Sequence, residues 1–174
     1  MSNIKLFKMT KELARTYYQG FELDLDLFMN PETFQPYVYS EEKSDATVER
    51  YRQLGRVFLA IMRDDAPIGE VVLKNIDQTR KHCTLGISLQ NDSVKGRGYG
   101  TRAEILALEY AFGEMGMETV FADSILKNTR SQHVLEKVGF VETGSDDAFR
   151  YYRCDKQNWK CPERRPLPET ANAA

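Results

Sequence analysis

The sequence predicts an α/β domain with a mixed, mostly antiparallel central sheet of about seven strands, flanked by about four helices. Three short apolar segments follow one another between residues 57 and 89, separated by polar turns, as in consecutive antiparallel strands. The chain then runs as helix, strand, helix and hairpin. A strand, a helix and a second strand in succession usually form a parallel pair with a right-handed crossover. One parallel pair in an otherwise antiparallel sheet is therefore expected.

The composition is that of an ordinary globular domain. The chain has 174 residues, of which 41% are hydrophobic and 29% charged, enough for one domain with its own core. A net charge of −2 argues against general nucleic-acid binding, and no apolar run reaches the ~20 residues of a membrane span. No apolar segment typical of a secretory leader follows the first residues, so a cytoplasmic protein is expected.

Cysteine and histidine usage does not indicate a metal site. The sequence holds three cysteines and two histidines, without a Cys-x-x-Cys pair, so neither a zinc site nor a disulfide framework is expected. Residues 1–161 are predicted to form a single domain, and the proline-containing stretch 162–174 is predicted to be a disordered tail.

The elements of the first half follow from local patterns. Thr10 is a good N-cap for a first helix whose apolar face includes Leu13 and Tyr17. Ser44 or Asp45 could cap the second helix. Strands and helices are expected at residues 4–8, 11–18, 46–54, 57–63, 68–75 and 83–89.

The second half begins with a helix that follows a glycine-rich stretch and ends at Gly116. Glu104 is predicted to lie mostly outside the apolar face of this helix. That face consists of Ile105, Leu108, Phe112 and Met115. Asn128 opens a last helix that Gly139 ends. The remaining strands are expected at residues 119–125, 140–143 and 149–154.

Residues 22–40 have the weakest pattern, because prolines interrupt the alternation of acids and leucines, and a loop or a short helical turn is as plausible as a strand. The carboxylates of Glu22, Asp24 and Asp26 could draw a cationic amine to an acceptor-facing surface. A solvated face over a row of leucines is the more common use of such a pattern. A group of tyrosines could line an acceptor groove or pack in the core. These are Tyr37, Tyr39, Tyr151 and Tyr152.

Three glycines at alternate positions, Gly96, Gly98 and Gly100, join the third apolar strand to the helix. Glycine allows a positive φ and a close backbone approach, and a helix start offers unpaired N–H groups under a partial positive charge. Such a loop can hold a phosphate, with Lys95 and Arg97 adding positive charge. A glycine-rich turn without a ligand is equally consistent with the spacing. The spacing fits neither the dinucleotide fingerprint nor the nucleoside-triphosphate loop.

Two motifs resemble the GCN5-related N-acetyltransferase superfamily, and within it the branch that acetylates ribosomal-protein N-termini. The stretch from Lys95 to Thr101 is similar to the acetyl-CoA loop Gln/Arg-x-x-Gly-x-Gly/Ala, with Lys95 in the first position. About 30 residues later, Asn128-x-x-Ser131 followed by Glu136-Lys137-Val138-Gly139-Phe140 is similar to a second family motif. The resemblance covers roughly residues 3–155.

The resemblance implies a pair of splayed parallel strands with acetyl-CoA as co-substrate and no metal. The pantetheine arm would lie between the strands, held by backbone groups of Ile87, Ser88 and Leu89. Asn128 would face the pantetheine or its sulfur, although an asparagine N-cap needs no ligand. The pyrophosphate would be held by the loop residues Lys95, Gly96, Arg97, Gly98, Tyr99, Gly100 and Thr101.

The catalytic side chains depart from the wider family. Leu135 stands where many members have a tyrosine that protonates the thiolate, and Thr84 stands where a glutamate is usual. The resemblance implies Ser131 as the acid, although it could instead bond its own helical turn. Glu70 is a candidate base acting through water, or a surface carboxylate of its strand. The same two interpretations apply to Asp123, in the middle of its own strand.

The resemblance therefore implies an N-acetyltransferase in which a primary amine attacks acetyl-CoA directly. A protein or peptide N-terminal α-amine is the favoured acceptor, since its pKa of ~8 makes it easier to deprotonate than an alkyl ammonium near ~10. A polyamine, an aminoglycoside or another small amine is the alternative. A non-catalytic acyl-CoA-binding module is a rival of another class. A homodimer is a further possibility.

Overall fold

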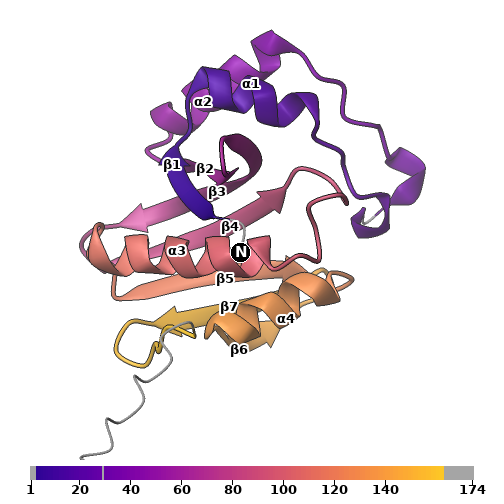
Figure 1. Cartoon of the computed structure of the whole chain (residues 1–174). Coiled ribbons are helices and arrows are strands. Elements are labelled where there is room, and N and C mark those ends of the chain that lie inside the picture. The colour runs from indigo at the N-terminus through magenta and orange to yellow at the C-terminus, as the bar shows by residue number, and fades with distance from the viewer. Residues whose placement is uncertain (1–2, 29, 163–174) are drawn as a thin grey trace, which may run out of the picture.

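The computed structural model describes residues 3–28 and 30–162, and these form one seven-stranded sheet with helices on both faces (Figure 1). The strand order is β1-β2-β3-β4-β5-β7-β6, and every neighbouring pair is antiparallel except β4 and β5. The strands are β1 (Ile4–Lys8), β2 (Val57–Arg63), β3 (Ala66–Asp77), β4 (His82–Leu89), β5 (Thr119–Ile125), β6 (Val141–Ser145) and β7 (Phe149–Asp155). The helices are α1 (Lys11–Gln19), α2 (Glu41–Gln53), α3 (Tyr99–Gly113) and α4 (Thr129–Val138). The predicted fold class is confirmed.

The start of the second helix was predicted wrongly. Helix α2 begins at Glu41 because Ser40 is its N-cap, with the Ser40 Oγ accepting a hydrogen bond from the Lys43 N–H. Asp45 lies within the helix, where its carboxylate accepts hydrogen bonds from Arg15 of α1. The charge pair thus ties α2 to α1.

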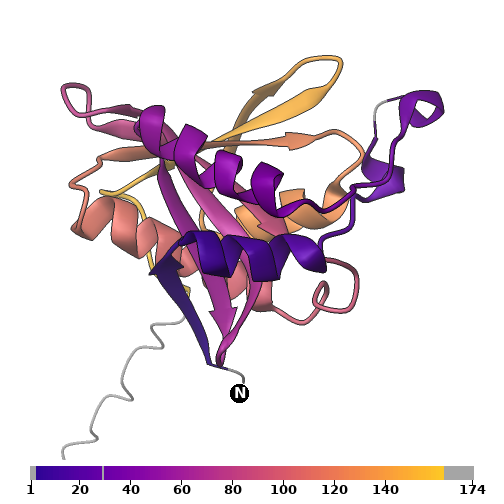
Figure 2. The ribbon, with the colours of Figure 1, turned by 90° about the horizontal axis from the view of Figure 1, so that it is seen from above.

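The weakly patterned segment after α1 contains two short 3-10 helices, Leu25–Leu27 and Pro31–Thr33. Each begins at a side-chain cap, Asp24 for the first and Asn30 for the second. Of the two alternatives left open by the sequence, a strand or a loop with a short helical turn, the structure shows the second. Figure 2 shows these turns at one end of the molecule.

Two separate cores lie on the two faces of the sheet. Helices α1 and α2 cover one face of the sheet (Figure 2). They enclose an aromatic-rich cluster that includes Tyr17, Tyr18 and Phe58. Helices α3 and α4 cover the other face, over a larger aliphatic cluster that includes Ile61, Val71 and Leu108. Because side chains alternate along each strand, neighbouring residues of β2 and β3 belong to different cores.

The parallel pair separates partway along its length. Strands β4 and β5 are paired from His82 opposite Thr119 to Leu85 opposite Ala122. Beyond this point β4 remains paired with β3 up to Leu89, while β5 remains paired with β7 up to Ile125. Each strand follows its own antiparallel partner, so the sheet opens between them, as the resemblance implied.

Across the described residues, no helix is both long and apolar enough to cross a membrane. The predicted tail lies outside the described residues from position 163 onward.

Candidate active site

A cavity of about 550 Å³ lies where β4 and β5 separate. This volume is within the usual range for small-molecule sites. Its apolar wall comes from both strands and from α4, through Ile87, Leu89, Ile125 and Val134. Its polar lining comes from Ser88, Lys95, Gly100, Glu104, Lys127, Asn128, Thr129, Arg130 and Ser131, and its remaining wall from the segment after α1. Residues from distant parts of the chain, between Phe21 and Val134, thus line one cavity.

The glycine loop turns the chain from β4 into α3. Gly96 and Gly98 have φ of +70° and +81°, a conformation that side chains with a Cβ rarely adopt. Gly98 is the N-cap of α3, and no described side chain caps this helix. Gly100, in the first turn, lines the cavity. The amides and positive dipole end of α3 therefore stand beside the cavity, an arrangement suited to an anion.

The ammonium group of Lys95 forms ion pairs with two carboxylates of the chain. Lys95 lines the cavity, but its Nζ lies 3.1 Å from a carboxylate oxygen of Asp24 and 2.9 Å from one of Asp92, and only 17% of its side chain is exposed. Burial alone would lower the pKa of Lys95, but hydrogen bonds to Asp92 and Asp24 raise it above its usual value. Its charge is thus already balanced by carboxylates.

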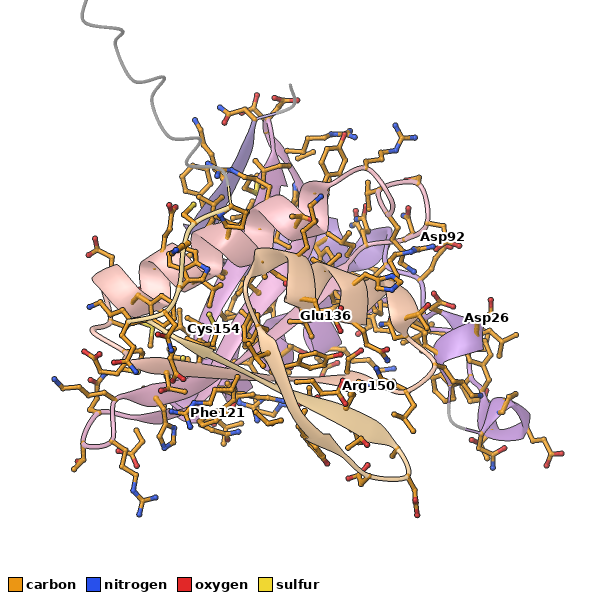
Figure 3. All side chains as sticks on the ribbon, turned by 90° about the horizontal axis from the view of Figure 1, so that it is seen from below. Asp26, Asp92, Phe121, Glu136, Arg150 and Cys154 are labelled. Atoms are coloured by element: carbon orange, nitrogen blue, oxygen red, sulfur yellow. The ribbon has the colours of Figure 1, made fainter. Side chains whose placement is uncertain are left out.

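The residues between Glu22 and Phe28 bridge the cavity. Asp24 joins this segment to the glycine loop through Lys95, and the Lys127 Nζ lies 3.4 Å from the Phe28 carbonyl oxygen on the other side. Figure 3 shows Asp26 and Asp92 at this same edge of the molecule. Sequence reasoning missed Lys127 and Arg130 as cations of the cavity, since they stand beside the second motif rather than within the glycine loop.

Asn128 and Ser131 lie together at the start of α4. The Asn128 Oδ1 accepts a hydrogen bond from the Ser131 N–H at 3.0 Å, so Asn128 is the N-cap of α4. Both residues line the cavity. Within the described part of the chain, the Ser131 hydroxyl has no hydrogen-bond partner, which leaves it available to a ligand.

Glu70 lies on the other face of the sheet from α3, directly opposite Ser88 of β4 and Ala60 of β2. Its Oε2 accepts a hydrogen bond of 2.8 Å from the Tyr18 hydroxyl. Burial raises the pKa of Glu70 to about 7, and the hydrogen bond from Tyr18 offsets part of this rise. Glu70 is half-buried on its strand, and its hydrogen bond with Tyr18 distinguishes it from a fully solvated carboxylate.

Glu70 does not line the cavity, but its strand neighbour Ser88 does. Side chains of directly opposed strand residues have Cβ atoms about 5 Å apart, and Ser88 itself lines the cavity. Sequence reasoning missed Tyr18, because its partnership with Glu70 depends on α1 packing across β3.

Glu104 was predicted to lie mostly away from the apolar face of α3, and this is wrong. It is only 2% exposed and lines the cavity, and its Oε2 has no hydrogen-bond partner in the described structure. Burial raises the pKa of Glu104 to about 8. The sequence held a signal, because Glu104 lies four residues before the inward Leu108, on the same stripe of the helix.

The four tyrosines do not form one groove. Tyr37 and Tyr39 pack against the aromatic core under α1 and α2. Tyr152 is 1% exposed in the aliphatic core, whereas Tyr151 is exposed on the same strand, where its hydroxyl donates to Asp146. The packing alternative holds for all but Tyr151.

Comparison with known proteins agrees with this geometry. Residues 6–141 match the family described as "Acetyltransferase (GNAT) domain". A Bacillus subtilis (strain 168) protein named "Putative ribosomal N-acetyltransferase YdaF" is 27% identical over 95 residues, which make up 55% of this chain and 51% of that protein. The chain thus matches about half the length of that relative.

Solved structures share the fold at low identity. An acetyltransferase of the GNAT family from Bacillus anthracis has a TM-score of 0.70 at 18% identity, over 90% of this chain and 98% of the other. A dodecameric spermidine N-acetyltransferase from Vibrio cholerae has a TM-score of 0.68 at 15% identity, over 88% of this chain and 94% of the other. The family match covers most of the chain, and the chain therefore belongs to the GNAT acetyltransferase family.

Proposed function

We propose that this GNAT domain transfers the acetyl group of acetyl-CoA to a primary amine, with a protein or peptide N-terminal α-amine as the favoured acceptor. The observation that carries the proposal is the cavity between the separated ends of β4 and β5, which adjoins an α3 N-terminus that no described side chain caps. An elongated thioester with an anionic pyrophosphate matches both parts of this space.

The residues present fit acetyl-CoA. The backbone amides at the start of α3 would bind the pyrophosphate, with Lys127 and Arg130 supplying positive charge. The edge of β4 from Ile87 to Leu89 no longer pairs with β5, so its backbone groups on that side can hydrogen-bond the pantetheine arm. Asn128 and Ser131 would lie at the same arm from the α4 side.

The chain's side chains can manage the protons of an acetyl transfer. The acceptor amine must lose a proton to attack the thioester carbon, and Glu70 would receive it, through water and past Ser88. A backbone N–H of β4 near Ile87–Leu89 would stabilise the developing oxyanion. The Ser131 hydroxyl would then donate a proton to the departing thiolate.

The acceptor is proposed from two considerations. An α-amine with a pKa of ~8 is more readily deprotonated by a carboxylate than an alkyl ammonium near ~10. The similarity to the Bacillus subtilis relative named for ribosomal N-acetylation supports the same choice. A polyamine is the second candidate, supported by the structural likeness to a spermidine N-acetyltransferase and by carboxylates of Glu22 and Asp26 at the cavity.

Mass spectrometry of products, after incubation with acetyl-CoA and a panel of N-terminal peptides, polyamines and aminoglycosides, tests the proposal. We expect acetylated peptide α-amines. Labelling of polyamines alone would move the acceptor to the second candidate. Measured binding of acetyl-CoA without any labelled product would favour the non-catalytic acyl-CoA-binding module instead.

Replacing Ser131 with alanine tests the proposed acid. We expect kcat to fall by roughly 10- to 100-fold, because the thiolate then leaves without a positioned proton donor, while the Kd for acetyl-CoA stays within about twofold. Single-turnover kinetics and calorimetry measure the two quantities. The matched control is Ser145→Ala, which removes a hydroxyl at an exposed strand position outside the cavity lining. An alanine variant with wild-type turnover would remove Ser131 from the mechanism.

We also propose self-association, since a structural neighbour is dodecameric and a homodimer is predicted from the family resemblance. Sedimentation velocity measures the state directly.

A further inference from the structure

We propose that Glu104, in its protonated form, donates a hydrogen bond to an amide carbonyl of the pantetheine arm, and is thus a cofactor-positioning residue of this chain. This inference rests on the proposed function, because it takes acetyl-CoA as the occupant of the cavity. None of the family motifs in the sequence includes position 104.

Within the described residues, the carboxyl group of Glu104 is buried with an unpaired oxygen. Glu104 is 2% exposed, and its Oε2 has no hydrogen-bond partner anywhere in the described structure. Buried polar groups in folded proteins are nearly always hydrogen-bonded, so an exception calls for a partner from outside the chain, which can be a ligand or an ordered water. The cavity is the place from which such a partner can come, since Glu104 lines it.

Glu104 lies beyond the part of the cavity where the pyrophosphate would bind. Gly100 stands in the first turn of α3, at the proposed pyrophosphate site, and Glu104 lies four residues, and thus about 6 Å, further along the helix. The apolar side chains of Ile87, Ile125 and Val134 line the same cavity. The part of acetyl-CoA that continues from the pyrophosphate is the pantetheine arm, whose polar groups are two amides and a hydroxyl.

The surroundings of Glu104 favour the neutral, protonated form of its carboxyl group. No cation of the cavity forms an ion pair with Glu104 in the described residues, and burial disfavours its charged form, which raises its pKa to about 8. A neutral carboxylic acid has one O–H donor, whereas a carboxylate has none. Other charged groups line the same cavity, and they are unchanged in every variant used in the test. They are Glu22, Asp24, Asp26, Lys95, Lys127 and Arg130.

Two substitutions separate the hydrogen bond from packing. Glu104→Leu keeps much of the volume and removes the donor, whereas Glu104→Gln keeps a neutral donor. We expect calorimetry at pH 7 to show acetyl-CoA bound roughly tenfold more weakly by the leucine variant, and within about twofold of wild type by the glutamine variant. The matched control is Glu109→Gln, an exposed position of the same helix, with wild-type affinity.

A truncated ligand locates the contact. Adenosine 3′-phosphate 5′-diphosphate has the nucleotide and pyrophosphate of coenzyme A without the pantetheine arm. We expect all four proteins to bind it equally. A leucine variant that loses affinity for both ligands has disturbed the pyrophosphate site, which would overturn the assignment.

The pH dependence gives a second test that holds even if the leucine variant does not fold. Between pH 7 and pH 9 the wild-type carboxyl loses its proton, so acetyl-CoA affinity should fall relative to that of Glu104→Gln, in which the donor does not titrate. Parallel pH profiles would contradict the inference. Unchanged acetyl-CoA affinity in Glu104→Leu would also contradict the inference. If Glu104→Leu instead raised only the KM for the amine, Glu104 would be assigned to the acceptor site. Failure of wild-type protein to bind acetyl-CoA would instead refute the proposed function.

Discussion

Replacing Gly98 with valine is expected to weaken acetyl-CoA binding by roughly 100-fold, with the fold retained. Gly98 is the N-cap of α3 at φ +81°, and among the described residues no atom beyond its own chain neighbours and helix backbone lies within 4 Å of the position where its Cβ would be. A β-branched side chain there would occupy the space through which the pyrophosphate approaches the helix amides, and it would strain the left-handed conformation. Calorimetry with acetyl-CoA measures the loss.

The chain offers a matched control for the strain. Gly116 follows the other end of α3, with φ +68° and an equally open Cβ position. Gly116→Val should lower the thermal stability by a similar amount, since the backbone strain is alike, yet bind acetyl-CoA as wild type does. Equal affinities of the two variants would refute the assignment of the glycine loop to the pyrophosphate.

Replacing Glu70 with glutamine is expected to lower kcat/KM by roughly 100-fold, because a positioned base is lost. The pKa of Glu70 is raised to about 7, and the base acts only when ionised. Wild-type kcat/KM should therefore rise with pH through about 7 and level off above it. An α-amine acceptor adds its own rise near ~8, and only this second rise should remain in Glu70→Gln. The measurement is the pH profile with a peptide acceptor.

Tyr18→Phe tests the role of Glu70 in a second way, through the pH at which kcat/KM rises. The Tyr18 hydroxyl donates to the Glu70 Oε2 and lowers its pKa, so its loss should raise that pKa and move the first rise to more alkaline pH. The plateau should be nearly kept. Glu142→Gln, at an exposed strand position, is the control with an unchanged profile. A wild-type profile in Glu70→Gln would mean that Glu70 takes no part in proton transfer.

The sequence by itself determined the order of the elements, and it predicted the glycine loop and helix start on which the proposed acetyl-CoA site is based. Alternation predicted the strands, and the spacing of Gly96 and Gly98 predicted a turn into a helix whose start favours an anion. These features depend on residues near one another in the chain, so local pattern suffices. The same reasoning placed the start of α2 too late, because Ser40, Ser44 and Asp45 are all good caps and only the packing of α2 on α1 distinguishes them.

Only the tertiary structure decided which carboxyl groups are buried and where they lie. Glu70 is paired with Tyr18 because α1 crosses β3, and Glu104 is enclosed because it lines the space where β4 and β5 separate, beside α4. The pKa of each carboxyl is set by groups from distant parts of the chain. A glutamate on an amphipathic pattern looks the same in the sequence whether solvent or a cavity covers it. Desolvation is a property of the assembled fold, and it is what separates these two glutamates from the chain's exposed ones.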